Sequence, residues 1–409
     1  MAMPGRYMSM ASGPMAANGR LVILMGALAA MGPLAIDMYL PGMPAMGVAL
    51  HATVSETEAT VSAFLAGMAI GQLLYGPASD RLGRRGPLLV GVVLYTLASV
   101  ACALALSPHL LIGARFLQAI GASAGGVVGR AVVRDRFGHT QTARMLSMLS
   151  LVVGLAPILA PLVGGFCLVL GGWRANFWAM AGFGVAVGIT AYAVMEETLS
   201  PAARRHARSE HPLMTYLALV RQRRLAGYLL AGGLNGATLF TYISAAPALL
   251  IRTYHIPAAQ FGWVFGVNAC GLVAGGQINR LMLRRRTPDQ VLARAGFVAV
   301  GFGLLLCLAA YSGVGGPLSV LPLLFCVITV YPFMQGNTMA GALNVDPARA
   351  GSTSALAGFA SFGVGALVSG ATAMFADGTA RPMATAMLLA LTASSLSLRY
   401  LAIGSERRL

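Results

Sequence analysis

The stretch GPASDRLGRR, Gly76 to Arg85, links two long apolar segments that we place near 57–78 and 87–106. Gly76 and Gly83 permit a tight turn. Asp80 can accept hydrogen bonds from a helix N-terminus or pair with one of the neighbouring arginines. A short charged turn between two apolar segments of about 20 residues is typical of a chain that crosses a membrane and turns back.

The composition of the whole chain agrees with this reading. Of its 409 residues, 57% are hydrophobic and only 10% are charged, with a mean hydropathy of +0.75, whereas soluble proteins carry about 25% charged residues. The apolar runs are continuous rather than alternating, so they predict helices. We expect an all-α membrane protein of twelve transmembrane helices in two six-helix halves, near 21–42, 57–78, 87–106, 109–131, 145–170, 174–194, 225–250, 259–281, 290–311, 317–340, 352–375 and 381–402.

The basic residues are distributed by side of the membrane. All 28 are arginines, and with a cytoplasmic N-terminus 24 of them fall in cytoplasmic segments. The other side has Arg174, Arg252 and Arg381, and Arg115 lies inside a helix. This is the positive-inside pattern. The net charge of +16 is therefore explained by topology, and nucleic-acid binding is not expected. We predict a multi-pass membrane protein with both termini cytoplasmic.

The longest polar stretch, Glu196 to Arg224, divides the chain into equal halves. It predicts a cytoplasmic linker with one short amphipathic piece, Leu213 to Val220. The first apolar run is too long for a signal peptide. The expected divisions are a tail at 1–20, a bundle at 21–194, the linker at 195–224, a second bundle at 225–402 and a tail at 403–409. Gly71-Gln72 and Gly276-Gln277 occupy corresponding places in the two halves and suggest an internal duplication.

Nothing in the chain indicates an enzyme. It has no G-x-x-x-x-G-K-[ST] nucleotide site and no nucleophile–base–acid set. The five cysteines lie in apolar segments without CxxC pairs or metal-ligand spacing, which favours small buried fillers. We therefore expect no metal and no cofactor.

The turn at 76–85 resembles the G-x-x-x-D-R-x-G-R-R signature loop of the major facilitator superfamily. The resemblance implies a conformational latch between the two halves on the cytoplasmic side, made by Gly76, Asp80, Arg81, Gly83, Arg84 and Arg85.

Two further motifs carry the resemblance to this superfamily. Arg115 to Gly121, RFLQAIG, resembles its R-x-x-Q-G motif with Ala119 in place of the usual glycine, and implies that Arg115 takes part in proton coupling. Gly154 to Gly165, GLAPILAPLVGG, resembles the G-P-x-x-G-G motif of proton-driven exporters, with Ala160 replacing its first glycine. That motif lets its helix bend against the second half, and comprises here Pro157, Pro161, Gly164 and Gly165.

Asp37 stands near the end of the first apolar run. Its segment DMYLPGMP, Asp37 to Pro44, resembles the start of the bicyclomycin/chloramphenicol-resistance (Bcr/CflA-type) branch of drug:proton antiporters. The segments 261–268 and 347–356 resemble later segments of the same branch. Burial penalises a charged carboxylate and a nearby arginine favours it. A group balanced between the two can load and release a proton. Asp37 is the only acidic residue that we place well inside a helix, so it is the predicted proton site. The alternative is a fixed Asp37–Arg115 ion pair that holds two helices together.

Six polar residues in helices 1, 4, 7, 8 and 10 are candidates for the substrate-binding cavity, because the resemblance implies that these helices line it. Each could equally form an interhelical hydrogen bond. They are Tyr39, Gln118, Asn235, Tyr242, Asn268 and Asn337.

The resemblance implies a monomer in the bacterial inner membrane that exports small amphipathic drugs or metabolites by alternating access, driven by the proton gradient. One titrating carboxylate suggests about one proton per cycle. One alternative is a proton-coupled importer of a small metabolite. The other is a non-transporting membrane sensor, against which the short linker and tail argue. The sequence does not identify the substrate.

Overall fold

The computed structural model describes residues 15–137, 139–209 and 211–403. The expected tails at 1–20 and 403–409 lie largely outside these residues. The first half contains α1 (Met15–Asp37), η1 (Leu40–Gly42), α2 (Met43–Ala49), α3 (Val54–Leu82), α4 (Arg85–Ala103), α5 (Pro108–Arg136) and α6 (His139–Val194). The second half contains α9 (Arg223–Pro247), η2 (Ala248–Thr253), α10 (Ala258–Met282), α11 (Pro288–Ser312), α12 (Pro317–Val345), η3 (Pro347–Arg349), α13 (Ala350–Met374), α14 (Arg381–Ser397) and η4 (Leu398–Ile403).

Eleven segments of the described chain are long and apolar enough to cross a membrane. One of them, Met148–Val194, lies in α6 and contains a break at Gly171 and Gly172. Gly172 has φ +69°, in the left-handed region that favours glycine. The part of α6 before the break packs on α1 and α10, and the part after it packs on α4. α6 therefore makes two passes, and the expected twelve-helix all-α fold is confirmed.

Local sequence signals define several helix ends. Thr53 and Glu56 form a capping box at the start of α3, with the Glu56 carboxylate accepting from the Thr53 backbone N–H at 2.8 Å. Thr287 and Gln290 form a second box at the start of α11. Gly313, with φ +67°, ends α11 in the left-handed conformation.

The first helix is shorter at its C-terminal end than the expected 21–42. α1 ends at Asp37, and the chain then passes through η1 and α2 before α3 begins. Pro41 and Pro44 favour the break, because proline has no N–H for the helical hydrogen-bond ladder and each of the two lies in the first turn of a new helix, η1 or α2. The consequence is that Asp37 lies at a helix terminus rather than within a helix.

The linker between the halves is more helical than expected. The predicted piece at Leu213–Val220 is confirmed as α8 (Pro212–Val220), but α7 (Pro201–Ser209) was not predicted. Pro201 and Pro212 each occupy the first helical position, where the missing N–H costs nothing. These two prolines therefore begin helices within the expected linker.

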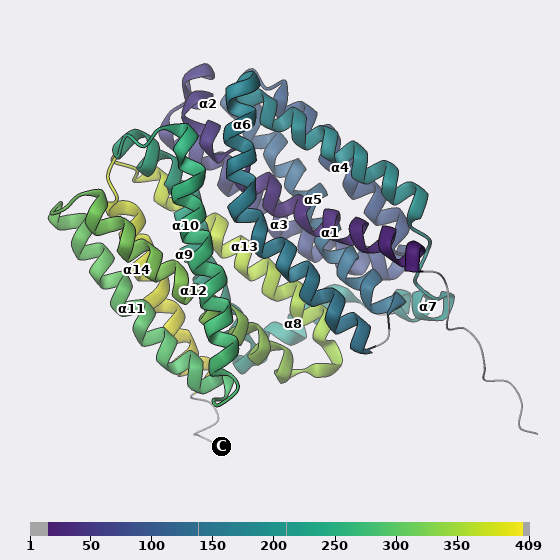
Figure 1. Cartoon of the computed structure of the whole chain (residues 1–409). Coiled ribbons are helices and arrows are strands. Elements are labelled where there is room, and N and C mark those ends of the chain that lie inside the picture. Colours follow the sequence, from purple (N-terminus) through teal and green to yellow (C-terminus); the bar gives the residue numbers. More distant parts are fainter. Residues whose placement is uncertain (1–14, 138, 210, 404–409) are drawn as a thin grey trace, which may run out of the picture.

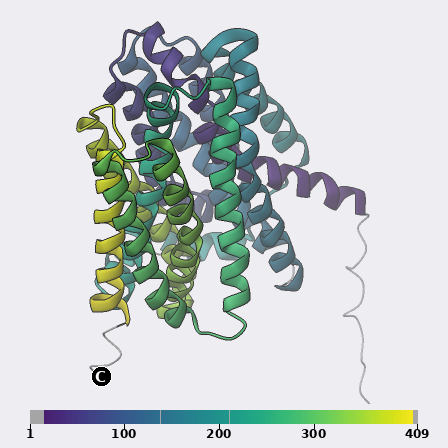
Figure 2. The same ribbon diagram turned by 60° about the vertical axis from the view of Figure 1, so that its left-hand side comes forward.

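The two halves lie side by side. Figure 1 shows the purple-to-teal helices of the first half on the right and the green-to-yellow helices of the second half on the left. In the view of Figure 2 the helices of the second half run alongside one another. The main contacts between the halves join α3 to α13 and α6 to α10. Counted as membrane crossings, α3 is the second, the first part of α6 the fifth, α10 the eighth and α13 the eleventh. The second crossing thus meets the eleventh, and the fifth meets the eighth.

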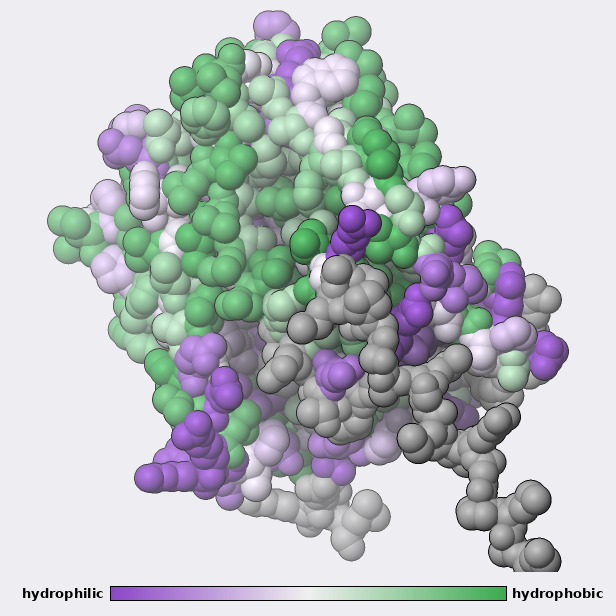
Figure 3. All heavy atoms as spheres, turned by 45° about the vertical axis from the view of Figure 1, so that its right-hand side comes forward, coloured by the Kyte–Doolittle hydropathy of each residue, from purple (hydrophilic) through white to green (hydrophobic). Residues whose placement is uncertain are grey.

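The surface divides the molecule into zones. The face in Figure 3 is hydrophobic over its upper and middle part, with hydrophilic residues gathered toward its lower end. We call the end that carries the loop 83–84 and the helices α7 and α8 the arginine-rich end. The opposite end carries the loops at 104–107, 254–257 and 375–380.

Glycines at equivalent positions bring helices of each half together. A Cβ on Gly67 or Gly71 of α3 would meet α5, at Ala119 (2.8 Å) and at Ser123 Cβ (2.7 Å) respectively. A Cβ on Gly271 or Gly275 of α10 would meet Thr329 of α12 in the same way. Both pairs have the small-xxx-small spacing that lets helix backbones approach in membranes. This correspondence supports the suggested duplication, with Gly71 matching Gly275 rather than Gly276.

Candidate functional site

Asp37 is buried at the C-terminal end of α1, with 2% of its surface exposed. Its Oδ1 atom is buried and has no hydrogen-bond partner among the described residues. The following turn, η1, packs against α6 and against α10 of the second half. Tyr242 of α9, in the second half, lies within electrostatic range of Asp37. A carboxyl group without a hydrogen-bonded partner at Oδ1 therefore lies where the two halves meet.

Arg115 is fully buried on α5, inside the first half. Its guanidinium lies over three aromatic rings, at 4.2 Å from the centroid of Tyr39, 4.3 Å from that of Phe64 and 5.8 Å from that of Phe177. It donates a hydrogen bond of 2.5 Å from NH1 to Oε1 of Gln118. The arginine thus interacts with ring faces and an amide. Phe64 and Phe177 were not singled out from the sequence, where no motif marks them.

The alternative of a fixed Asp37–Arg115 ion pair does not hold in this structure. Among the described residues, the ion pairs are formed by other groups. NH1 of Arg115 bonds Gln118, whereas its Nε and NH2 atoms are buried without a hydrogen-bond partner in the described part of the chain. The aspartate and the arginine are linked indirectly: Tyr39, two positions after Asp37, covers the guanidinium and shares a hydrogen bond of 3.0 Å with Thr60.

The motif at Pro157–Gly165 lies between the Asp37 turn and the second half. A Cβ on Gly164 would overlap the carbonyl group of Met38, the residue next to Asp37. From the other side, a Cβ on Gly262 of α10 would lie 3.1 Å from the backbone nitrogen of Leu162. Gly165 has open space around it. The backbone of α6 is therefore in close contact with both the Asp37 turn and α10.

The six predicted substrate-binding residues are all buried and form three separate groups. Tyr242 accepts a hydrogen bond of 2.9 Å from Asn268 and stacks on Phe265 at 5.3 Å. Gln118 and Tyr39 belong to the Arg115 cluster. Asn235 and Asn337 bond neighbouring helices, with Asn235 donating to Gln335 at 3.1 Å and Asn337 to Asn279 at 2.9 Å.

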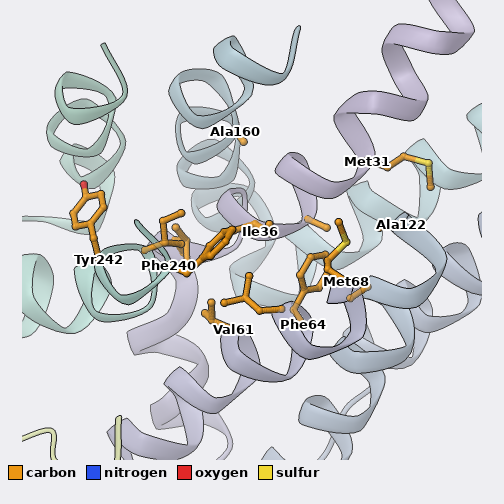
Figure 4. Close-up of a cluster of buried hydrophobic side chains, with 14 of the residues drawn as sticks. Met31, Ile36, Val61, Phe64, Met68, Ala122, Ala160, Phe240 and Tyr242 are labelled. Atoms are coloured by element: carbon orange, nitrogen blue, oxygen red, sulfur yellow. The ribbon is translucent and has the colours of Figure 1, made fainter. Parts of the chain in front are cut away.

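An apolar cluster lies between Tyr242 and the first half. Figure 4 shows Phe240 and Tyr242 of α9 on one side of it, Val61, Phe64 and Met68 of α3 on the other, and Ile36 of α1 between them. All are buried members of one hydrophobic core. This cluster is therefore mainly apolar, and the hydroxyl group of Tyr242 is the polar group among the side chains named here.

The signature loop is tied to its own half and to the linker. Arg84 pairs with Asp80 of α3 and, at 2.9 Å, with Asp135 of α5. Arg204 of α7 donates to the carbonyl oxygen of Arg81 at 3.0 Å, and Arg81 donates to that of Ala207 at 3.3 Å. The described contacts of the loop thus join α3, α5 and α7, and the predicted latch between halves stays a prediction.

Glu197 completes this loop from the end of α6. Its carboxylate accepts from the backbone N–H of Arg84 at 2.9 Å and of Leu199 at 3.0 Å. Partial burial alone raises the pKa of a carboxyl group, but these backbone hydrogen bonds hold the pKa of Glu197 below its usual value. Gly83 has φ +97°, and a Cβ there would meet the Glu197 carboxylate. Glycine is therefore required at this position on both counts.

A cleft of about 800 Å³ lies at the arginine-rich end, with residues of both halves and of the linker in its walls. Its basic residues are Arg81, Arg84, Arg130, Arg134 and Arg349. None of the six predicted substrate-binding residues is among those that line it. At the opposite end a cavity of about 60 Å³ lies between the halves. The halves are thus more widely separated at the arginine-rich end.

Glu58 is a buried carboxylate that sequence reasoning missed. We expected Asp37 to be the only acidic residue well inside a helix, and this is wrong, because Glu58 lies within α3 and only 3% of its surface is exposed. The expected helix began at 57, which left Glu58 at its edge. The Thr53–Glu56 capping box was the available signal, since it starts the helix at Val54 and places Glu58 beyond the first turn.

Comparison with known proteins identifies the family. The profile described as Major Facilitator Superfamily matches residues 24–370. The chain is 32% identical over 393 residues to an uncharacterized MFS-type transporter, YdgK, of Bacillus subtilis, covering 95% of this chain and 96% of that protein. It is 28% identical over 381 residues to the bicyclomycin resistance protein homolog of Haemophilus influenzae, covering 93% and 95% of the two chains.

Two further similarities complete the comparison. The chain is 32% identical over 250 residues to the multidrug resistance protein MdtL of Escherichia fergusonii, covering 61% of this chain and 63% of MdtL. Among solved structures, a D-xylose–proton symporter superposes with a TM-score of 0.73 at 13% identity, covering 95% of this chain and 98% of that one. The second similarity concerns the fold alone. The resemblance drawn from the sequence motifs is confirmed.

Proposed function

Because this chain belongs to the Major Facilitator Superfamily, it is a multi-pass membrane transporter and not an enzyme, and we propose that it exports small amphipathic compounds in exchange for protons. The relatives named for bicyclomycin and multidrug resistance support export of drug-like compounds. We further propose a monomer in the bacterial inner membrane with both termini cytoplasmic, since the arginine-rich end obeys the positive-inside rule.

The observation that carries this proposal is the position of Asp37. It is buried at the break of the first helix, Oδ1 has no hydrogen-bond partner among the described residues, and Tyr242 of the other half is within electrostatic range. An ionised carboxylate in such a site is costly unless it is paired. Its protonation state therefore favours one arrangement of the halves over the other, which is what coupling requires.

The proposed cycle begins from the arrangement described here, with the cleft open at the arginine-rich, cytoplasmic end. Substrate enters from that side and reaches the apolar cluster beside Tyr242 as Asp37 gives up its proton to the cytoplasm. The halves then rock about the α3–α13 and α6–α10 contacts, substrate leaves on the far side, and a proton from that side reloads Asp37. The cycle moves about one proton per turnover, because Asp37 is the single carboxyl group proposed to carry one across.

Arg115 has a supporting role in this proposal. It is held by the rings of Tyr39, Phe64 and Phe177, so its charge stays fixed while Asp37 titrates. Tyr39 follows Asp37 closely in the chain, and any movement of the α1 break is passed to the arginine through that ring. The Asp37 turn and Arg115 are thus linked through the Tyr39 ring, without an ion pair between Asp37 and Arg115.

The test is drug resistance in a bacterium that lacks its own efflux pumps. Wild type, Asp37→Asn and Asp37→Glu are compared at matched membrane levels against phenicols, bicyclomycin, quinolones and lipophilic cations. We expect raised inhibitory concentrations for wild type, the empty-vector level for Asp37→Asn and partial recovery for Asp37→Glu. Glu196→Gln, which removes an exposed carboxylate at the arginine-rich end, is the matched control and should behave as wild type.

Inverted membrane vesicles test the direction of transport. With an acidic interior, an exporter accumulates substrate and releases protons, so dissipating the gradient must stop uptake. Full resistance in Asp37→Asn would refute Asp37 as the proton site. Substrate movement in the opposite direction would replace export with import.

A further inference from the structure

Glu58 carries an inference beyond the proposed cycle. It lies near the start of α3, at the end of the molecule opposite the arginine-rich cleft. It faces the cavity of about 60 Å³ between the halves, together with Leu249, Arg252 and Thr372 of the second half and Met383 of α14. Among the described residues, none forms a hydrogen bond or ion pair with its carboxyl group. Glu58 is thus a buried acid at a closed contact between the halves.

The contact around Glu58 belongs to the surface that must separate when this end opens. Ser244 of α9 donates to the backbone carbonyl of Glu58 at 3.5 Å, across the two halves. Ser62, one turn further along α3, shares a hydrogen bond of 3.0 Å with Ser369 of α13. A Cβ on Gly370 would also lie 3.5 Å from Ser62. Opening of this end therefore breaks the contacts that keep Glu58 from water.

The charged groups near Glu58 are few. Within the part of the chain that the structure describes, Arg252 of η2 is the other charged residue that lines the cavity, and its guanidinium lies against Gly47 of α2. On the same helix Glu56 is exposed and engaged in the capping box, with His109 of α5 nearby. None of these compensates an ionised Glu58 by a direct contact.

We propose that Glu58 is a second proton-binding site, which is protonated when the end opposite the arginine-rich cleft is closed and ionised when that end is open. The proton comes from the water on that side as the halves close and returns there as they open, so it adds no net proton movement. An unpaired carboxylate is costly to bury, and hence ionisation of Glu58 holds this end open. An acidic exterior then favours closure after Asp37 has been loaded. The inference rests on the proposed function only in assuming that the two ends open in turn.

The experiment measures the opening of this end directly. Spin labels are placed on Leu106→Cys, in the loop before α5, and on Phe375→Cys, after α13, where both side chains are exposed. The five native cysteines are replaced in a background that retains resistance activity. Distances between the labels are measured in lipid nanodiscs by pulsed electron paramagnetic resonance from pH 5 to pH 9. The variants are Glu58→Gln, Glu58→Asp and Glu56→Gln.

In the wild-type background we expect a longer distance to gain population as pH rises, by at most about tenfold per pH unit for one proton. Glu58→Gln should keep the short distance at every pH, because the neutral amide never ionises. Glu58→Asp should retain the pH dependence. Glu56→Gln is the matched control, since glutamine also completes a capping box, and it should follow wild type.

Three results would overturn the inference: no pH dependence in wild type, the same dependence in Glu58→Gln, or its loss in Glu56→Gln. The measurement does not depend on which compound is moved, and so it is separable from the proposed function. With Asp37→Asn in the same background, the Glu58-dependent change should persist. Its disappearance there would assign the pH dependence to Asp37 and refute Glu58 as a site of its own.

Discussion

Arg115 keeps its charge inside the first half by contact with three ring faces and one amide. The planar guanidinium can lie flat on Tyr39 and Phe64, at 4.2 and 4.3 Å from their centroids, while NH1 donates to Gln118. Gln118 in turn donates to Ser99 at 2.7 Å. Lysine offers a point charge without this planar geometry. The site therefore requires arginine for its shape as well as its charge.

Arg115→Lys should abolish resistance and lower the free energy of unfolding by about 2 kcal/mol, the value of a desolvated cation–π contact. Inhibitory concentrations and thermal unfolding in detergent check this. Arg174→Lys is the matched control: Arg174 stacks on Trp173 at 4.2 Å and donates to a backbone carbonyl near the surface. Wild-type behaviour of Arg115→Lys would show that charge alone is sufficient.

At the residue scale, prediction from sequence succeeded where a side chain is anomalous for its surroundings. An aspartate and an arginine in apolar runs marked Asp37 and Arg115 as buried polar residues, and both are buried. The partners of Arg115 could not be found in this way, because Phe64 and Phe177 are ordinary in apolar helices. Which side chains face a buried charge depends on the rotation of each helix about its axis, and the hydrophobic pattern of the sequence does not determine that rotation.

The elements that surround Asp37 meet through their backbones. α1 ends at Asp37, and the carbonyl of the next residue, Met38, lies where a side chain on Gly164 of α6 would be. The adjacent residue, Gly165, has no atom within 4 Å of the equivalent position. Two neighbouring glycines of one motif therefore have different roles, one as a contact and one in open space.

Gly164→Ala should push α6 from the Asp37 turn and lower the free energy of unfolding by about 1–3 kcal/mol, as overpacking does, with loss of resistance. Gly165→Ala should change neither. Both variants are compared by thermal unfolding and inhibitory concentrations at equal membrane levels. Equal effects of the two substitutions would contradict the close contact with Met38.

The loop beside Gly83 has its own pH dependence. Since the pKa of Glu197 is lowered in the folded protein, its contribution to stability is present above the unfolded value of about 4.3 and is lost as pH falls through the lower folded pKa. The difference in melting temperature between wild type and Glu197→Gln should be clear at pH 7 and shrink below pH 4. Glu196→Gln, at the exposed neighbour, should give little difference throughout.

Element boundaries were predictable where length and hydropathy decide them, and less so at turns. The ranges expected for α4 and α13 lie within a few residues of the observed helices. The end of α1 was not foreseen, because the expected first helix continued past Pro41 to residue 42. The helix α7 was not foreseen, because the polar stretch 196–224 favoured a loop, although proline also favours the first position of a helix. Capping residues indicate where helices begin. Among them, the Thr53–Glu56 capping box was a signal clear enough to have moved the expected start of α3 from 57 to Val54.

Both halves of the molecule use a pair of glycines, four residues apart, to bring two helices into close contact. Gly67 and Gly71 place α3 against α5, and Gly271 and Gly275 place α10 against α12. The same two helices, α3 and α10, also form the main contacts between the halves, since α3 meets α13 and α10 meets α6. Each half is therefore held together by a helix that also contacts the other half, so internal packing and the interface between the halves share the same elements.

Gly71→Ala and Gly275→Ala should destabilise the protein to a similar degree, by about 1–3 kcal/mol each, because each added methyl group overlaps a neighbouring helix. Gly276→Ala is the control, with its nearest neighbouring atom at 4.0 Å. Thermal unfolding in detergent is the measurement. A strong effect at Gly276 and none at Gly275 would restore the register first suggested from the sequence.

The number of helices and the placement of arginines followed from hydropathy and the positive-inside rule, which are properties of long segments. The conformational state of the molecule, with one end open and the other closed, could not be predicted from these properties. Whether the halves are apart at the arginine-rich end, as the cleft of about 800 Å³ shows, depends on small differences in free energy between two packings of the same chain. Asn235 and Asn337 were candidates either for the cavity lining or for interhelical hydrogen bonds, and in this arrangement they form hydrogen bonds to neighbouring helices.

The contact between Gly164 and the Met38 carbonyl has a consequence for evolution. It is made by main-chain atoms, so the side chains that surround the transported compound can be exchanged without disturbing it. Under selection with a new toxic compound, we expect adaptive substitutions to collect at Ile36, Met68 and Phe240, with Gly164 unchanged in every surviving lineage. Deep sequencing of selected variants would reveal this division between a variable lining and an invariant joint.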